Sequence, residues 1–392
     1  MVKSKGRRDI IVPCSGAGHR VRLGKGRRFW LSAKCPKCKA PVDPWRGRRF
    51  LAFFKNPKSP AGNSWQERGI WWGTLAFVAS ALLAFFMVRG LGDRWWPATV
   101  LLFGPRWILL LPILVLLPVA LLRDRALSVP LLLAGALILG PVLGLETGWK
   151  ALISGGASEA SIRVVSFNAR GGDLLIRTPA NLLGDWQADI VAFQECGRTF
   201  ATALEQIPGW HFDHRSGLCL MSRFEILEVM EMERESLEFA GGAGVVATYR
   251  LGPEEAPIYL TNLHLETPRA GFELIRSGRL GQGIKKVREK SLLRTIELRR
   301  AGAWADFFEG PHIVTGDFNT PPESRSYREA WGDWQNTFST VGRGFGGTRL
   351  NGWIRVRIDH ILGSDDWKVL DAWLEKDVGS DHLPIVAELV ER

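Results

Sequence analysis

Two hydrophobic patterns divide the chain. From about residue 70 to residue 145 apolar residues follow one another almost without interruption, whereas after residue 160 they form short runs that polar residues close. Long apolar runs are typical of membrane-spanning helices, and short bounded runs are typical of buried strands. The pattern therefore predicts an apolar helical middle, residues 70–147, followed by a strand-rich domain.

The apolar middle contains three stretches that are long enough to cross a bilayer. Residues 70–88 include 19 residues without a charge, residues 126–145 include 20, and residues 98–122 are apolar except for Arg106. Since a spanning helix needs about 20 mostly apolar residues, we expect transmembrane helices at about these three positions. Three prolines in the second stretch leave a re-entrant segment open as an alternative, which would invert the topology.

The charges beside these stretches predict their orientation. Residues 1–69 hold 18 Lys and Arg residues against 3 acidic residues, and the loop from Arg123 to Arg125 adds two arginines. Because Lys and Arg are retained in the cytoplasm, we expect a cytoplasmic N-terminal head and a later domain on the outer side of a bacterial cytoplasmic membrane. Residues 148–161 would be the linker, and a flexible tether from Glu146 to Ser161 would keep that domain near the membrane.

The basic head carries a metal-binding pattern. Two cysteines separated by two residues follow an upstream cysteine and histidine, and such a set predicts a structural zinc ribbon at about residues 10–45. Ala17 stands where a second cysteine would complete a pair with the first, so a basic tail without zinc is the alternative. The four candidate zinc ligands are Cys14, His19, Cys35 and Cys38.

The strand-rich region has a different charge from the head. Residues 151–392 hold 27 Lys and Arg residues against 34 Asp and Glu residues, a balance of −7. A protein that binds DNA through bulk phosphate attraction usually shows the opposite bias, so this balance argues against such a substrate. The region also contains Cys196 and Cys219, and the sequence leaves open whether they pair.

Polar patches follow the short apolar runs of this region, at the ends of the expected strands. They supply carboxylates, carboxamides and histidines, and none offers a candidate Ser or Cys nucleophile. Oxygen ligands suit Mg²⁺ or Mn²⁺, and imidazoles move protons, so the inventory suits metal-dependent hydrolysis. The patches are Ser166-Phe167-Asn168, Gln194-Glu195, Asn262-Leu263-His264, Gly316-Asp317-Phe318-Asn319, Arg357-Ile358-Asp359-His360 and Ser380-Asp381-His382.

The order of these patches resembles that of the endonuclease/exonuclease/phosphatase superfamily, whose members are similar to DNase I. The resemblance covers about residues 160–391 and implies an α/β fold, a two-sheet β-sandwich flanked by helices, over residues 162–392. The hydrophobic pattern alone indicates only an α/β domain with many strands.

The resemblance also implies a metal site. It assigns Glu195 as the residue that holds a Mg²⁺ or Mn²⁺ ion, with Asn168 and Asp381 nearby. An acid at a strand end that is merely solvated is the alternative reading of Glu195.

The remaining patches receive catalytic roles from the same resemblance. We expect water to attack phosphorus in line, without a covalent enzyme intermediate. Asp317 would position or deprotonate the attacking water, and Asn319 would contact phosphate or water. His264 would touch the phosphate and protonate the leaving oxygen. His382 would be the general base or transition-state donor, with its ring oriented by Asp359. His360 is expected to be structural.

One basic run stands out in the otherwise acidic domain. It follows His264 and mixes cations with apolar residues, which suits anionic headgroups beside lipid. The candidate substrate-binding residues in it are Lys285, Lys286 and Arg288. A solvated helix face is the alternative interpretation.

Three functions are compatible with these features. The first is hydrolysis of a phosphodiester, phosphomonoester or pyrophosphate in a lipid-linked substrate, which the tether and the acidic domain favour. The second is an extracytoplasmic endonuclease, for which the basic run would be the groove. The third is a sensor or scaffold that binds a phosphate ligand without catalysis, against which the full set of patches argues.

Overall fold

The computed structural model describes residues 10–13, 20–23, 65–149, 161–232, 244–352 and 354–392. The candidate zinc ligands Cys14, His19, Cys35 and Cys38 lie outside these residues, so the zinc ribbon stays a prediction. In the head the structure describes the antiparallel strands β1 (Ile10–Pro13) and β2 (Arg20–Leu23).

The chain divides into two compact units. One consists of Met1–Ala76 and Ile113–Leu132, and the other of Phe77–Pro112 and Leu133–Arg392. The second unit contains the whole strand-rich domain together with parts of all three apolar stretches.

Three helical segments are long and apolar enough to cross a membrane: Arg68–Arg94, Arg106–Arg123 and Arg125–Val142. The expected number of candidate spans therefore agrees with the structure, while the crossing itself stays a prediction. The segments are built from α2 (Trp65–Phe85) with η1 (Phe86–Leu91) and η2 (Gly92–Arg94), from η3 (Arg106–Leu110) with α4 (Leu111–Arg123), and from η4 (Arg125–Leu127), α5 (Ser128–Leu137) and η5 (Ile138–Val142).

The second apolar stretch, expected as one helix at residues 98–122, is divided. Helix α3 (Trp96–Phe103) ends before Gly104, whose φ of −84° and ψ of 178° are extended. Gly104 precedes Pro105, and the proline ring disfavours helical geometry in the residue before it. The second candidate span therefore begins only at Arg106.

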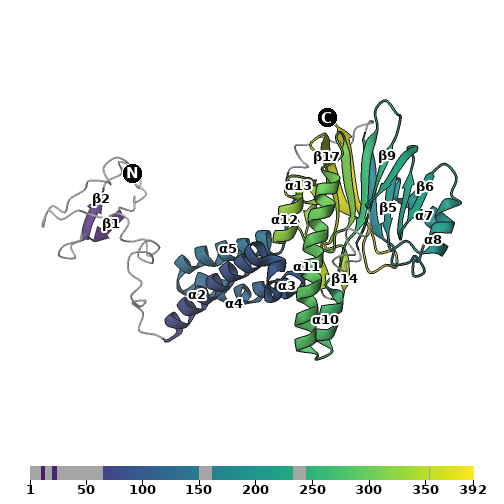
Figure 1. The fold of residues 1–392 in the computed structure, drawn as a ribbon. Helices are drawn as coiled ribbons and strands as arrows, with labels where there is room; N and C mark the ends of the chain where they lie inside the picture. The colour runs from purple at the N-terminus through teal and green to yellow at the C-terminus, as the bar shows by residue number, and fades with distance from the viewer. Residues whose placement is uncertain (1–9, 14–19, 24–64, 150–160, 233–243, 353) are drawn as a thin grey trace, which may run out of the picture. The chain divides into compact units, whose positions relative to one another are not determined.

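The strand-rich domain is built on two six-stranded sheets (Figure 1). The first has the order β17-β18-β4-β5-β7-β6, and the second has the order β12-β16-β11-β10-β9-β8. The strands of the first are β4 (Ile162–Asn168), β5 (Ile190–Gln194), β6 (His211–Arg215), β7 (Leu218–Ser222), β17 (Trp367–Leu374) and β18 (Ile385–Glu391). Those of the second are β8 (Ile226–Glu231), β9 (Val245–Leu251), β10 (Ile258–His264), β11 (His312–Asp317), β12 (Gln335–Asn336) and β16 (Asp359–Gly363).

The main core lies between the two sheets. Inward-facing residues alternate along the strands, and Val164, Ile190, Leu260, Ile313 and Ile361 are among those in this core that are completely buried. The residues of the opposite strand faces pack under helices.

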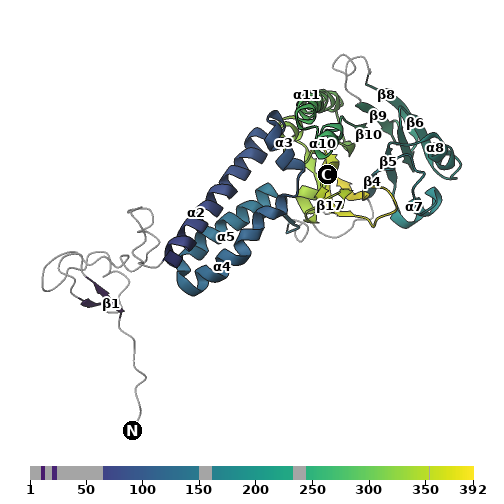
Figure 2. The ribbon, with the colours of Figure 1, turned by 90° about the horizontal axis from the view of Figure 1, so that it is seen from below.

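Helices cover the outer faces of both sheets (Figure 2). Helices α7 (Pro179–Trp186) and α8 (Arg198–Glu205) pack on the first sheet, and α11 (Leu280–Ala305) packs on the second. Among the described residues of the domain, the remaining helices are α10 (Arg269–Arg276), α12 (Arg325–Trp331) and α13 (Thr337–Val341). The expected α/β fold with two sheets and flanking helices is thereby confirmed.

Strand pairing determines where the polar patches lie. Strands β4 and β5 are parallel with Asn168 opposite Gln194, and β10 and β11 are parallel with His264 opposite Asp317. Strand β16 runs antiparallel to β11 and begins at Asp359, opposite Asp317. Since parallel strands end at the same edge of a sheet, these side chains gather at one end of the sandwich.

Buried ion pairs hold the end of the first candidate span and the start of the second within the second unit. Asp93 Oδ1 lies 2.9 Å from Arg294 Nη2 on α11, both side chains are completely buried, and Ser324 Oγ donates to Asp93 Oδ2 at 2.6 Å. Arg106 Nη1 contacts Glu323 Oε2 at 3.0 Å, again with both side chains buried.

The expected flexible tether is partly ordered at its start. Strand β3 (Glu146–Thr147) pairs antiparallel with β13 (Arg343–Gly344) of the strand-rich domain. The prediction of a flexible tether is therefore wrong for Glu146 and Thr147, whereas residues 150–160 lie outside the described part of the chain.

Replacing Asp93 by alanine should strongly destabilise the protein. The change leaves the guanidinium of Arg294 buried without its counter-charge, which typically costs about 3–5 kcal/mol. Arg94→Ala is the matched control, because Arg94 pairs with Glu329 at an exposed position, where such pairs contribute about 0–1 kcal/mol. Thermal unfolding of the detergent-solubilised full chain measures the loss of stability in both variants. Equal, small losses in the two variants would show that the buried pair is absent.

Candidate active site

The polar patches meet at the edge of the sandwich. Asn168 lies on the first sheet and Glu195 directly follows its strand β5, whereas His264, Asp317 and Asp359 lie on the second sheet. All five were predicted from the sequence, and together with the predicted His382 they form one cluster of contacts.

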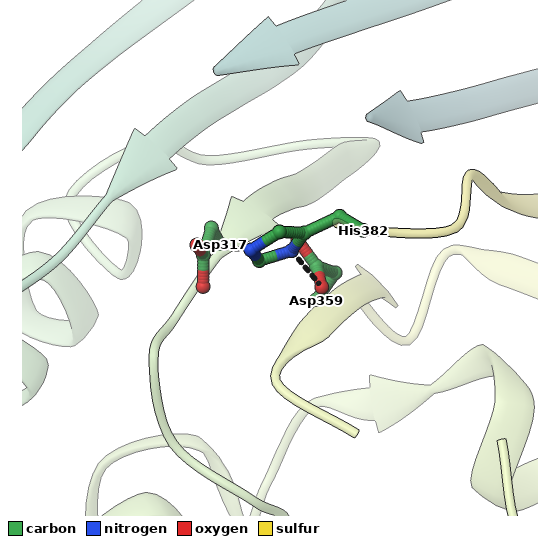
Figure 3. A group of neighbouring side chains, drawn as sticks. All are labelled: Asp317, Asp359 and His382. Atoms are coloured by element: carbon green, nitrogen blue, oxygen red, sulfur yellow. Dashed lines mark hydrogen bonds and ion pairs between the residues drawn. The ribbon is translucent and has the colours of Figure 1, made fainter. Parts of the chain in front are cut away.

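Asp317, Asp359 and His382 form the buried centre of the cluster (Figure 3). His382 Nδ1 lies 2.8 Å from Asp359 Oδ2 and 3.0 Å from Oδ1, while His382 Nε2 lies 3.8 Å from Asp317 Oδ2. This contact fits the orienting role expected of Asp359, which stays a prediction, and it leaves Nε2 facing the second carboxylate. The three groups offer ligand atoms within 4.8 Å of one another, so they could also enclose a metal ion.

The two carboxylates hold a proton on the histidine. Burial by itself lowers the pKa of His382, but the negative charges of Asp359 and Asp317 outweigh burial and raise that pKa to about 9. Burial and the charge of Asp359 raise the pKa of Asp317 to about 6. Without a metal, His382 is therefore a cation near neutral pH and can donate a hydrogen bond to an anion.

Asp317 also connects this centre to the first sheet. Asn168 Nδ2 donates to Asp317 Oδ2 at 3.0 Å and to Glu195 Oε1 at 3.1 Å. His264 Nε2 lies 3.8 Å from Asp317 Oδ2 and 3.7 Å from Glu195 Oε1. The Glu195 side chain is 44% exposed, so its carboxylate is open to solvent, whereas the carboxylate of Asp317 is buried.

The donor set fits a hard divalent cation. The carboxylates of Glu195 and Asp317 both face the amide of Asn168 and the imidazole of His264. The buried Asp317 also lies beside Asp359, whose negative charge raises the pKa of Asp317. Oxygen ligands and uncompensated negative charge are what Mg²⁺ and Mn²⁺ require.

Backbone strain is concentrated at this edge. Among the described non-glycine residues, five have positive φ, and three of these are Arg170 (48°), Glu195 (47°) and Asn319 (48°) in or beside the cluster. Each such residue costs on the order of 1 kcal/mol, and strain of this kind collects at functional sites.

Asn319 and His360 are tied to the backbone. Asn319 Nδ2 donates to the Leu265 carbonyl at 2.8 Å, so this amide shapes the loop, and its expected phosphate contact stays a prediction. His360 Nε2 lies 2.9 Å from the Thr320 carbonyl, and burial lowers its pKa to about 4. Its expected structural character agrees with these contacts.

Asp381, the third expected metal ligand, contacts cations. Its Oδ2 forms ion pairs with Arg349 and, at 3.6 Å, with Arg170 Nη1. Its metal role stays a prediction. Sequence reasoning missed both arginines: the position of Arg170 two residues after Asn168 was an available signal, whereas nothing in the pattern marks Arg349.

A buried amide pair lies beneath the cluster. Gln194 Nε2 donates to Asn262 Oδ1 at 2.8 Å, and Asn262 Nδ2 donates to the Phe193 carbonyl at 3.1 Å. Both side chains are completely buried, and they join β5 of one sheet to β10 of the other. In the sequence both residues are visible only as members of polar patches, and nothing there signals that they pair.

Cys196 and Cys219 form a disulfide, which the sequence left open. Cys196 directly follows Glu195, and Cys219 lies on β7 beside β5. The bond therefore ties the Glu195 turn to the neighbouring strand.

The candidate basic residues lie on the first half of α11. Lys286 Nζ pairs with Glu289 at 2.8 Å, and Lys285 and Arg288 are exposed. Over the described residues, none of the three contacts the cluster, and their substrate role stays a prediction. Lys290 reaches closer, because it pairs at 2.7 Å with Glu266, two residues after His264.

A sequence profile of the Endonuclease/Exonuclease/phosphatase family matches residues 165–382. Among curated proteins no match is found.

Solved structures with similar folds include D. rerio TDP2 complexed with a single-strand DNA product, at 17% identity and a TM-score of 0.47 over 59% of this chain and 99% of that chain. A mannosyl-6-phosphatase of Bacteroides thetaiotaomicron has 20% identity and a TM-score of 0.41, with 58% and 99% covered. ANGEL2, a 2',3'-cyclic phosphatase, has 17% identity and a TM-score of 0.40, with 58% and 95% covered.

Metal-free protein should lose stability as the pH rises through the folded-state pKa of His382. That pKa, about 9, exceeds the ordinary value of 6.5, so the folded state binds this proton more tightly. The resulting stability is complete below about pH 6.5 and is lost as the pH rises through about 9, a change of about 3 kcal/mol.

Thermal unfolding in EDTA at several pH values measures this loss. His382→Gln should remove it, whereas His211→Gln, at an exposed position on β6, should retain it. A pH profile that is the same for wild type and His382→Gln would refute the assignment.

Proposed function

The chain belongs to the endonuclease/exonuclease/phosphatase family, whose members are metal-dependent phosphoester hydrolases, and we propose that it is a membrane-tethered phosphoesterase. It hydrolyses a phosphodiester, phosphomonoester or pyrophosphate of a lipid-linked substrate at the outer face of the cytoplasmic membrane. The observation that carries the hydrolase assignment is the buried Asp317 carboxylate, which faces Asn168, His264 and His382.

Glu195 and Asn168 would hold the divalent ion, Mg²⁺ or Mn²⁺. Glu195 is the more suitable anchor because its carboxylate is accessible, whereas His382 Nδ1 is already engaged by Asp359. Asp381 remains the candidate third ligand. When bound, the ion neutralises phosphate oxygens and the leaving group.

The other residues of the cluster handle the proton and the phosphoryl charge. Asp317, with its raised pKa, positions the attacking water and accepts its proton. His382 is a cation, and we therefore assign it as a hydrogen-bond donor to the phosphoryl oxygens rather than as the base. His264, beside both carboxylates, faces the leaving oxygen, and Asn319 holds the loop after Asp317.

Two observations support an outer, membrane-side location. The chain has three candidate spans, and the head is basic, which favours a cytoplasmic N-terminus. The Cys196–Cys219 disulfide fits an oxidising compartment, because thiols are kept reduced in the cytoplasm.

A lipid-linked substrate is favoured by the way the domain is held. The pairs Asp93–Arg294 and Arg106–Glu323 join it to the end of the first candidate span and to the start of the second. The net charge of −7 over residues 151–392 disfavours bulk DNA binding. An extracytoplasmic endonuclease is the second candidate, supported by the exposed cations on α11, including Lys285 and Arg288.

Glu195→Gln should reduce phosphoesterase activity by about 10³-fold, because an amide neutralises a divalent ion poorly. Full-chain protein is assayed on bis(p-nitrophenyl) phosphate with excess Mg²⁺ or Mn²⁺. Glu205→Gln, at the end of α8, is the control and should keep wild-type activity. Near-normal turnover by Glu195→Gln at saturating metal would show that the metal assignment is wrong.

Thiol blocking in intact cells should separate the cysteines by compartment. We expect mass spectrometry after alkylation to find Cys196 and Cys219 as a disulfide. Cys14, Cys35 and Cys38 should appear as thiols or in a metal-protected form. If Cys196 and Cys219 are alkylated as free thiols in freshly blocked cells, the domain lies in the cytoplasm.

Hydrolysis of a lipid-linked phosphate in mixed micelles should exceed plasmid cleavage at equal enzyme concentration. Charge reversal of Lys285, Lys286 and Arg288 to Glu should weaken it severalfold, because these cations would bind the headgroup. Reversal of Arg198, an exposed cation that begins α8, is the control. Efficient nicking of plasmid with no turnover of any lipid phosphate would favour the nuclease.

A further inference from the structure

Two arginines flank Asp381 at the edge of the cluster, and the proposed reaction uses neither. Arg349 forms an ion pair with Asp381 Oδ2, and Arg170 Nη1 lies 3.6 Å from the same oxygen. The Arg349 side chain is 20% exposed and that of Arg170 is 44% exposed, so both remain accessible to solutes.

The main chain fixes Arg349 next to the catalytic histidine. Strand β14 (Arg349–Asn351) pairs with β15 (Ile354–Val356), and Arg349 lies opposite His382 in an antiparallel bridge. The Leu350 amide donates to the Asp381 carbonyl at 2.8 Å, and the Leu383 amide donates to the Thr348 carbonyl at 2.7 Å. The backbone of Arg349 is therefore held beside His382, and the ion pair with Asp381 directs its guanidinium.

Arg170 is held by a strained backbone. Its φ is 48°, and its amide donates to Asn168 Oδ1 at 3.0 Å, so it is tied to a proposed metal ligand. An arginine in this left-handed region costs on the order of 1 kcal/mol, and such strain persists where function requires it.

The charges around Asp381 do not balance. Two guanidinium groups face one carboxylate, which leaves one net positive charge, and each guanidinium presents five N–H donors. Planar guanidinium groups of this kind suit phosphate oxygens. The inner cluster is different, because Glu195, Asp317 and Asp359 make it a site for a cation and water.

We propose that Arg170 and Arg349 form an anion subsite for a second phosphoryl group, so that the enzyme prefers a diphosphate ester to a monophosphate ester. This rests on the proposed function and names its substrate class. Water attacks the terminal phosphorus at the inner cluster, and its oxygen forms the new P–O bond. The bridging P–O bond breaks, and its electron pair stays on the leaving monophosphate ester beside the arginines. The water proton passes through Asp317 to solvent, and inorganic phosphate is the second product.

The test compares two esters with the same organic group. Full-chain protein in detergent is assayed on farnesyl diphosphate and farnesyl monophosphate at constant free Mg²⁺. Arg349→Gln should raise KM for the diphosphate about tenfold, while kcat/KM for the monophosphate stays within about twofold. Arg170→Gln should act in the same direction, and Arg349→Lys should partly restore the wild-type KM.

Arg355→Gln is the matched control, since Arg355 is an exposed arginine opposite Leu350 in the same pair of strands. It should leave both esters unchanged. Equal losses on both esters in Arg349→Gln would overturn the proposal, because they would indicate that Arg349 only positions His382. A loss confined to cleavage of a single-stranded oligonucleotide would overturn it as well.

Inhibition by methylenediphosphonate separates this inference from the proposed function. Its inhibition constant, or its dissociation constant in calorimetry, should rise about tenfold in Arg349→Gln, while that of inorganic phosphate should not change. If wild type hydrolyses neither ester but binds methylenediphosphonate through Arg349, the subsite stands and the hydrolase assignment fails. Wild-type affinity for methylenediphosphonate in Arg349→Gln removes the subsite.

Discussion

The burial of the Asp317 carboxylate is the constraint on which the site depends. This group lies at the end of β11, opposite Asp359, and two carboxylates this close and this deep cannot both remain charged without compensation. The structure supplies an amide from Asn168 and imidazoles from His264 and His382. A site that already tolerates excess negative charge is prepared for a divalent cation, and the same charge keeps His382 protonated.

A second constraint keeps the two halves of the site in register. Asn168 and the turn at Glu195 are fixed to one sheet and Asp317 to the other, and a sliding movement between sheets would separate them. The buried pair of Gln194 and Asn262 joins the sheets directly beneath the cluster. Because buried amides require these hydrogen bonds, the pair favours one alignment of the sandwich over others.

Much of the fold and of the inner site could be predicted from the sequence. Short apolar runs locate the strands, and the polar residues that close them are the ones that the structure gathers at one edge. The hydrophobic pattern also locates the apolar helices, because length and composition alone define a candidate span. It places the second span too early, since continuous hydropathy hides the break that Pro105 imposes on Gly104.

The contacts that the sequence could not predict join residues far apart in the chain. Arg349 reaches Asp381 through a short strand pair, and Asp93 reaches Arg294 across about two hundred positions. Neither partner has a local pattern, because an arginine in a loop or helix is ordinarily solvated. The Cys196–Cys219 bond has the same character, since spacing alone does not determine which cysteines meet.

The measurement that tests this account most directly is a titration of the full chain with Mn²⁺, followed by electron paramagnetic resonance. The account predicts one bound ion in the strand-rich domain, whose signal broadens when a phosphate ester is added and whose binding is lost when Glu195 is replaced by Gln. A chain that binds no Mn²⁺, or one that binds it equally well without the Glu195 carboxylate, would contradict the central claim.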